Sequence, residues 1–107
     1  MDLQGLRAFV AVGHHGSIRG AANALGYSES AVSRHIAAFE RSLGAPVFAR
    51  ERAGMLLTDL GASILPLATE VLETVAAIGH ARHGAGTSRH APGRPGVRSA
   101  GSATQRA

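Results

Sequence analysis

The sequence contains no cysteine and no lysine, and no uninterrupted apolar run approaches the ~18 residues that a membrane span needs. The absence of cysteine excludes disulfide bonds, thiolate metal sites and thiol nucleophiles. The first residues, MDLQGLRAFV, place no basic leader before an apolar stretch, so we expect no signal peptide. Together these absences favour a cytoplasmic protein that contacts no membrane.

Acidic residues are also absent after residue 83, where four of the eleven arginines lie: Arg89, Arg94, Arg98 and Arg106. The remaining seven arginines are balanced by seven acidic residues within positions 1–83. The net charge of +4 therefore belongs to the C-terminal tail. A case for nucleic-acid binding has to rest on where individual charges point, and not on bulk charge.

The tail begins at Gly84 with an abrupt change to small residues, GAGTSRHAPGRPGVRSAGSATQRA, among which Val97 is the only large apolar side chain. Such a segment buries too little surface to offset its chain entropy. We therefore predict a disordered basic tail over residues 83–107.

Three segments before Gly44 have the apolar spacing of amphipathic helices. Ser17 and Ser28 are in place to cap the second and third helices, and Gly26-Tyr27 between the two helices predicts a tight turn. The positions expected to face the core are Leu3, Leu6, Phe9, Val10 and Gly13 in the first helix, Ile18, Ala21, Ala22 and Leu25 in the second, and Val32, Ile36, Phe39 and Leu43 in the third.

The next segment is not helical in pattern. Two short apolar pieces, Val47-Phe48-Ala49-Arg50 and Met55-Leu56-Leu57, flank Glu51-Arg52-Ala53-Gly54. Gly54 supplies the permissive backbone of a hairpin tip. We predict a two-stranded wing, with Arg50 and Arg52 on or beside it.

A long helix is predicted over residues 59–82, because Thr58 and Asp59 repeat the capping pattern. Pro66 is expected to bend this helix or to remove a backbone hydrogen bond. Its apolar stripe lasts about five turns, too long for so small a domain to cover, so we expect it to pair with the same helix of a second chain. The residues expected at this dimer contact are Ile64, Leu67, Ala68, Val71, Leu72, Val75 and Ile78.

The order and the residues of these elements resemble the N-terminal part of the LysR-type transcriptional regulators. The match runs over residues 2–80 without gaps and includes the segment LQGLRAFVAVGHHGSIRGAANALGYSESAVSRHIAAFERSLGAPVFAR. The particular marks are Phe9, Gly16-Ser17, Ala21-Ala22, Leu25, Ser28, Ala31-Val32-Ser33-Arg34, Ile36, Leu43-Gly44, Phe48 with Arg50, and the LT-x-x-G pattern Leu57-Thr58-Asp59-Leu60-Gly61. Each mark is weak alone, but the combination at fixed spacing is specific.

The resemblance implies a mainly α fold: a winged helix-turn-helix, with a three-helix core and a short β-hairpin wing, over residues 1–58, followed by a linker helix that dimerises. It implies a bacterial transcription factor that binds double-stranded DNA, with helix 28–43 in the major groove. No cofactor and no enzymatic activity are expected. Residues 84–107 offer no counterpart of the family's ligand-sensing domain, so no small-molecule effector is implied.

Under this resemblance, Ser30, Ser33 and Arg34 lie on the outer face of the N-terminal part of the reading helix, which reaches base edges in such motifs. Arg34 suits either a bidentate contact to guanine or a phosphate. Ser17 and Thr58 are helix caps first, and their hydroxyls or the adjacent N–H groups are also expected near phosphates.

The wing arginines have different expected roles. Arg52 is expected to enter the minor groove or to hold a phosphate. For Arg50 two roles stay open, because a strand arginine beside Glu51 and Glu40 serves either DNA or a structural ion pair.

Three positions depart from what is common among relatives. Glu29 stands where the family usually has glutamine, so it either accepts the N4 amino group of cytosine or only complements the helix dipole. Gly20 and Ala53 replace basic residues that are common in relatives, which removes up to two phosphate contacts.

Other function classes have less support in the sequence. His80 and His83 are i, i+3 neighbours without the closed ligand set of a metal site, and no serine has an evident histidine and carboxylate pair. Two alternatives stay open: a truncated fragment whose long helix forms mixed dimers with a full-length regulator, and a truncated product without function.

Overall fold

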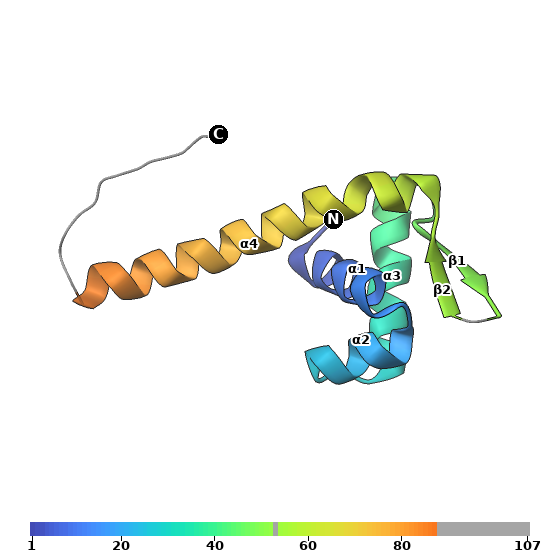
Figure 1. Cartoon of the computed structure of the whole chain (residues 1–107), viewed down its shortest axis with the longest axis horizontal. Coiled ribbons are helices and arrows are strands. Elements are labelled where there is room, and N and C mark those ends of the chain that lie inside the picture. Colours follow the sequence, from blue (N-terminus) through green and yellow to red (C-terminus); the bar gives the residue numbers. More distant parts are fainter. Residues whose placement is uncertain (53, 88–107) are drawn as a thin grey trace. The chain divides into compact units, whose positions relative to one another are not determined.

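The computed structural model describes residues 1–52 and 54–87, which form four helices and one two-stranded hairpin (Figure 1). The chain divides into two compact units, residues 1–73 and 74–107. The predicted tail lies outside the described residues from position 88 onward.

The N-terminal helices are α1 (Leu3–His15), α2 (Ile18–Leu25) and α3 (Glu29–Leu43). The side chains of Asp2, Ser17 and Ser28 cap them, each accepting a backbone N–H three residues further on at 2.9–3.1 Å. The helices end at Gly16, Gly26 and Gly44, respectively. The structure thus confirms the predicted serine caps and the tight turn between α2 and α3.

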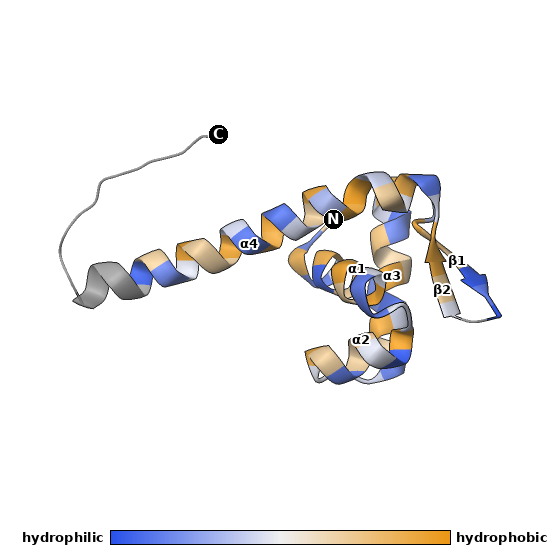
Figure 2. Cartoon of the chain, in the orientation of Figure 1, coloured by the Kyte–Doolittle hydropathy of each residue, from blue (hydrophilic) through white to orange (hydrophobic). Residues whose placement is uncertain are grey.

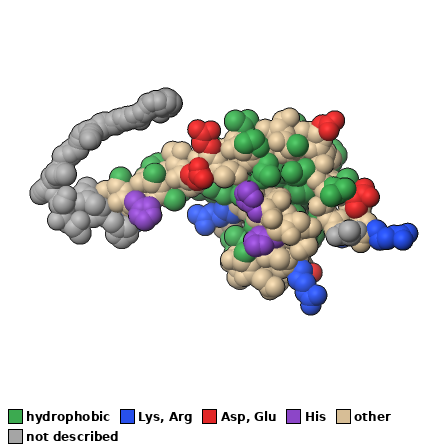
Figure 3. All heavy atoms as spheres, viewed as in Figure 1, with side chains coloured by type: hydrophobic (Ala, Val, Ile, Leu, Met, Phe, Trp, Pro, Cys, Tyr) green, Lys and Arg blue, Asp and Glu red, His purple; other side chains and the backbone are tan. Residues whose placement is uncertain are grey.

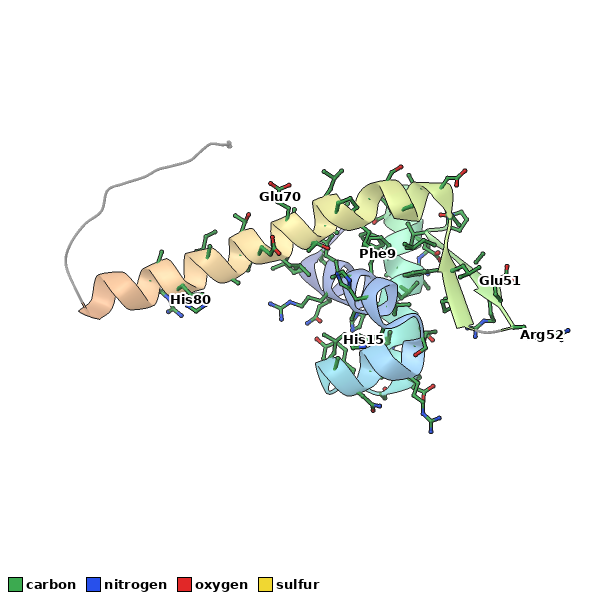
Figure 4. All side chains as sticks on the ribbon, viewed as in Figure 1. Phe9, His15, Glu51, Arg52, Glu70 and His80 are labelled. Carbon is green, nitrogen blue, oxygen red and sulfur yellow. The ribbon has the colours of Figure 1, made fainter. Side chains whose placement is uncertain are left out.

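Phe9 lies at the centre of the core (Figure 4). Its ring stacks on Phe39 of α3 with the centroids 5.0 Å apart, and its centroid lies 5.5 Å from that of Phe48 in the first strand. Such aromatic contacts contribute ~0.5–1.5 kcal/mol beyond the area that they bury. The other buried apolar residues are Ala8, Val12, Ala21, Ala22, Val32, Ile36, Val47 and Ala68.

The buried face of α1 agrees with the predicted one in part, because Phe9 is buried and Leu6 and Val10 are partly buried and pack against the core. The residues that this helix buries are Gly5, Ala8, Phe9 and Val12. Leu3 is instead 41% exposed. The reason is steric, because a Cβ at Gly5 would lie only 3.2 Å from Cβ of Phe39, so small residues let α1 and α3 approach closely. Gly13 lies against Leu65 of the last helix instead.

The hairpin consists of β1 (Phe48–Glu51) and β2 (Gly54–Leu57), which pair antiparallel and form the predicted wing. The register places Phe48 opposite Leu57 and Arg50 opposite Met55. Cross-strand partners share a face, and side chains alternate between faces along a strand. Because Met55 and Leu57 pack against the core, Arg50 lies on the wing face that is directed toward the helices.

The last helix is α4 (Asp59–Thr87). Its first turn is capped by Thr58, whose Oγ1 accepts the Gly61 N–H at 3.1 Å. A Cβ at Gly61 would overlap the carbonyl oxygen of Val47, so only glycine lets this turn lie against the base of the wing. The helix continues beyond residue 82, its predicted end, because each residue added to an existing helix gains a hydrogen bond without a new nucleation cost.

The segment Asp59–Arg82 of α4 is long and apolar enough to cross a membrane by length and composition, contrary to the expectation from the sequence. This segment contains no long uninterrupted run of apolar residues, because polar residues are spread among the apolar ones (Figure 2). Only 11% of its most apolar stretch is buried. Glu70 and Glu73 lie within it, and a charged side chain at the bilayer centre costs ~2.5–3.5 kcal/mol. Composition alone therefore does not make α4 a membrane span.

We expect Gly61→Ala to lower the free energy of unfolding by ~2–3 kcal/mol, because the added methyl group has to displace the Val47 carbonyl. Gly79→Ala is the matched control, since a Cβ at this helical glycine meets no atom within 4 Å and should raise stability by up to ~1 kcal/mol. Urea unfolding followed by circular dichroism measures both changes. Equal stability of the two variants would contradict the steric role of Gly61.

Candidate nucleic-acid interface

Tyr27 fixes the turn between α2 and α3. Its hydroxyl donates to Gln4 Oε1 in α1 at 2.6 Å, and its ring centroid lies 5.7 Å from that of His35 in α3. Its N–H donates to the Ala22 carbonyl at 3.0 Å and closes the turn after α2. These contacts orient the first turns of α3 relative to α1.

The N-terminal half of α3 presents a polar face to solvent. Ser30, Ser33 and Arg34 are exposed, whereas Val32 is buried on the opposite side. Within the described part of the chain, Ser33 and Arg34 form no side-chain hydrogen bond or ion pair. Ser30 has one contact, with its Oγ 3.3 Å from that of Ser28. The side chains of Ser33 and Arg34 are therefore available to a ligand without breaking internal bonds.

Glu29 lies in the first turn of α3 and is exposed. Its carboxylate has no partner among the described residues, so the position is compatible with both roles that the sequence left open. Gly20 is half-buried in α2, and a Cβ there would lie 3.0 Å from Cβ of His15 and 3.1 Å from Oγ of Ser17. A basic residue at this position would need His15 to move. Ala53 lies outside the described residues.

Both wing arginines are exposed. Figure 4 shows Arg52 at the tip of the wing, pointing away from the helices, with Glu51 beside it. On the face that Figure 3 shows, the described arginine side chains (blue) stand apart from one another and form no continuous basic patch. This agrees with the balance of seven arginines and seven acidic residues in positions 1–83.

Glu40 of α3 holds the base of the wing. Its Oε2 accepts the N–H groups of Val47 and Phe48 at 2.8 and 3.3 Å. The carboxylate therefore binds backbone, and in the described part of the chain Arg50 forms no ion pair with it or with Glu51. Of the two roles left open for Arg50, the structural ion pair is thus not found. The sequence offered no signal for this role of Glu40, because its partners lie seven and eight residues away.

The capping hydroxyls of Ser17 and Thr58 differ in whether their hydrogen is free to bind a further acceptor. Ser17 Oγ accepts the Gly20 N–H at 3.0 Å, which leaves its hydrogen for a further acceptor. Thr58 Oγ1 accepts from Gly61 and also donates to the Pro46 carbonyl at 2.9 Å. The Thr58 hydroxyl therefore has no hydrogen left for a phosphate, and its role is to join the base of the wing to α4.

The predicted dimer residues of α4 fall into three groups by exposure. Leu67, Val71 and Ile78 are strongly exposed, at 61%, 43% and 64%. The half-buried ones are Ile64, Leu72 and Val75. Ala68 is only 2% exposed and belongs to the core, so its side chain has little surface left for a partner chain.

In the part of the chain that the structure describes, no group of three or more histidine, aspartate or glutamate side chains is placed so that it could hold a metal ion. His14 lines a shallow hollow with Glu70 and Glu73 of α4. His80 is exposed, and the side chain of His83 lies outside the described residues.

A family model described as "Bacterial regulatory helix-turn-helix protein, lysR family" matches residues 3–62, which is more than half of the chain. The chain belongs to the LysR family. The matched region is the family's helix-turn-helix, so the resemblance drawn from the sequence is confirmed.

One LysR-family relative is a probable hydrogen peroxide-inducible genes activator of Mycobacterium avium. It is 45% identical over 71 residues, which cover 66% of this chain and 23% of that protein. The chain spans about a quarter of the length of this and similar curated relatives.

Solved structures of LysR-family DNA-binding domains confirm the winged helix-turn-helix fold. The DNA complex of the CbnR domain matches with a TM-score of 0.72 and 30% identity, over 80% of this chain and 99% of that chain. The BenM domain bound to catB site 1 DNA matches with a TM-score of 0.77 and 27% identity, over 83% and 100%.

We expect Glu40→Ala to lower the free energy of unfolding by ~2–3 kcal/mol, because two wing N–H groups lose a charged acceptor. Glu40→Gln keeps an acceptor oxygen and should lose less. Arg50→Ala should change stability by no more than ~0.5 kcal/mol, since the side chain is exposed and unpaired. Chemical denaturation of the three variants checks this order. A large loss of stability in Arg50→Ala would indicate that Arg50 forms a structural ion pair after all.

Proposed function

We propose that this chain binds a specific DNA sequence as a homodimer, with α3 reading base edges in the major groove and the wing contacting the flanking DNA. The observation that carries the proposal is the exposed polar face of Ser30, Ser33 and Arg34, two of which have no partner within the described residues. The likeness to LysR-family domains solved with DNA supports it.

The chemistry of α3 suggests which base edges it reads. The Arg34 guanidinium matches the two acceptors of guanine, O6 and N7, in a bidentate contact. The hydroxyls of Ser30 and Ser33 both donate and accept, so they suit several bases. The carboxylate of Glu29 only accepts, and the N4 amino group of cytosine is the base-edge partner that this permits. A G- and C-containing half-site is therefore expected.

The wing and the start of α2 supply contacts that position the domain. Arg52 reaches from the wing tip toward the minor groove or a phosphate, and Arg50 is an exposed second cation on the same hairpin. Ser17 has a hydroxyl hydrogen left to donate to a phosphate oxygen. The Thr58 hydroxyl is used within the fold, so a phosphate contact at the start of α4 would come from the adjacent N–H groups, the other route that the sequence left open.

Dimerisation follows from the small number of these contacts. Residues 1–83 carry no net charge, so one copy gains little non-specific attraction to the phosphate backbone. The exposed apolar residues Leu67, Val71 and Ile78 on α4 provide the contact between copies. A two-fold dimer places two α3 helices on half-sites one helical turn apart, or a multiple of it. We place this dimer in the cytoplasm, where bacterial DNA lies.

Arg34→Ala is expected to weaken binding to the preferred sequence about 10- to 100-fold, and to weaken binding to unrelated duplexes much less. The preferred sequence is first selected from a random duplex pool with the full chain. Fluorescence anisotropy then compares the selected and scrambled duplexes at two salt concentrations.

The matched control for that experiment is Arg41→Ala, which removes an exposed arginine from the last turn of the same helix. It should leave the ratio of the two affinities unchanged. If binding is sequence-independent, survives Arg34→Ala and disappears when residues 84–107 are deleted, the basic tail is responsible and the proposed reading role of α3 is wrong.

Replacing Leu67 and Val71 together by glutamate is expected to convert the dimer to a monomer at tens of micromolar, because two charges enter the apolar contact. Ala62→Glu adds a charge at another exposed position of α4 and should leave the dimer intact. Sedimentation velocity reads the oligomeric state. A monomeric unmodified chain would contradict the homodimer and favour a mixed dimer with another regulator.

A further inference from the structure

The wing is attached to the helices at two separate places. At its base, Glu40 binds the N–H groups of Val47 and Phe48, and the Thr58 N–H donates to the Val47 carbonyl at 3.0 Å. Near its tip, the Met55 N–H donates to the carbonyl of Gly16 at 3.2 Å. A two-stranded hairpin is marginally stable alone, so these attachments decide where the wing lies.

The tip attachment joins the wing to the helix-turn-helix itself. Gly16 ends α1 in a left-handed conformation, with φ of 75°, and α2 begins two residues later at Ile18. The Gly16 carbonyl thereby serves as an acceptor at the outer edge of β2, where a third strand would otherwise pair. Gly16, Arg52 and Met55 line one surface hollow together, which places the wing tip beside this turn.

Gly54 is the residue that permits this attachment. Its φ is 137°, which L side chains rarely adopt, and a Cβ there would lie only 2.7 Å from the Gly16 carbonyl oxygen. Any other residue would therefore push the wing tip away from the turn. Arg52 is two positions earlier in the chain, so its Cα lies within ~7 Å of the Cα of Gly54.

We propose that Gly54 is a positioning residue for DNA binding: its contact with Gly16 latches the wing tip to the start of α2 and sets the place of Arg52 relative to the reading helix. This inference rests on the proposed DNA contact of Arg52. The base attachment does not depend on Gly54, so breaking the latch should release the tip while the wing stays joined at Glu40 and Val47.

The test compares Gly54→Ala, Arg52→Ala and the double variant of the full chain, with the selected duplex as probe. Arg52→Ala should weaken binding about 5- to 10-fold and lower the slope of log affinity against log salt by ~1.8, which is ~0.9 for each of the two Arg52 side chains in the proposed dimer. Gly54→Ala should produce a similar loss and the same change of slope. The double variant should be no worse than either, and the preference for selected over scrambled DNA should persist in all three.

The control is Gly44→Ala. Gly44 also has a positive φ, 78°, but a Cβ there meets nothing within 4 Å. Gly44→Ala therefore also places an alanine at a positive φ, but it does not displace the wing. The slope of log affinity against log salt should stay at the wild-type value. Additive effects of Gly54→Ala and Arg52→Ala, or a wild-type slope in Gly54→Ala, would overturn the proposal.

Amide hydrogen exchange, measured by NMR without DNA, reads the latch directly. In Gly54→Ala the Met55 amide should exchange at least about tenfold faster, whereas the Thr58 amide at the base should stay protected. Unchanged protection of Met55 would also refute the latch. If Met55 is released but Arg52→Ala leaves the salt slope unchanged, the latch exists and the proposed DNA contact of Arg52 is the part that fails.

Discussion

The contact of Phe9 with Phe39 and Phe48 is the interaction on which the rest of this domain depends. It joins α1, α3 and the wing in one cluster, with ring centroids 5.0 and 5.5 Å apart. The surrounding residues are small, as at Gly5 and Ala8, so the helices approach closely enough to exclude water from the rings. With only three phenylalanines in the chain, all three are used here. The face of α3 with Ser30, Ser33 and Arg34 is outward because this cluster holds the opposite face inward.

The wing depends on backbone groups more than on side-chain packing. The Glu40 carboxylate and the carbonyls of Val47 and Gly16 bind N–H groups of the hairpin or of the residues that flank it. Glycines at 54 and 61 permit the two closest approaches. Hydrogen bonds of this kind are directional, so they fix an angle as well as a distance. A hairpin of two short strands is thereby attached to the rest of the domain at its base and near its tip.

The electrostatics favour selectivity over general attraction. In the proposed function, a neutral N-terminal part gains little from the phosphate backbone, so we expect affinity to come from well-placed contacts and from the pairing of two copies. The small number of arginine contacts also explains why α4 matters to the proposed function. Its exposed leucine, valine and isoleucine side chains form an apolar surface, which the proposed dimer would cover while adding a second copy of α3.

What the sequence determined by itself was local. Ser17 and Ser28 cap their helices, Gly54 belongs to the hairpin, and the outer face of α3 follows from a 3.6-residue period, because each depends on neighbours within a few positions. The tertiary structure decided the buried face of α1, the burial of Ala68 and the attachment of the wing to Gly16. These three features depend on which surfaces meet among residues that are distant in the sequence. Small residues become buried wherever two helices approach each other, and every residue has a backbone carbonyl, so the sequence does not show which carbonyl will accept a hydrogen bond.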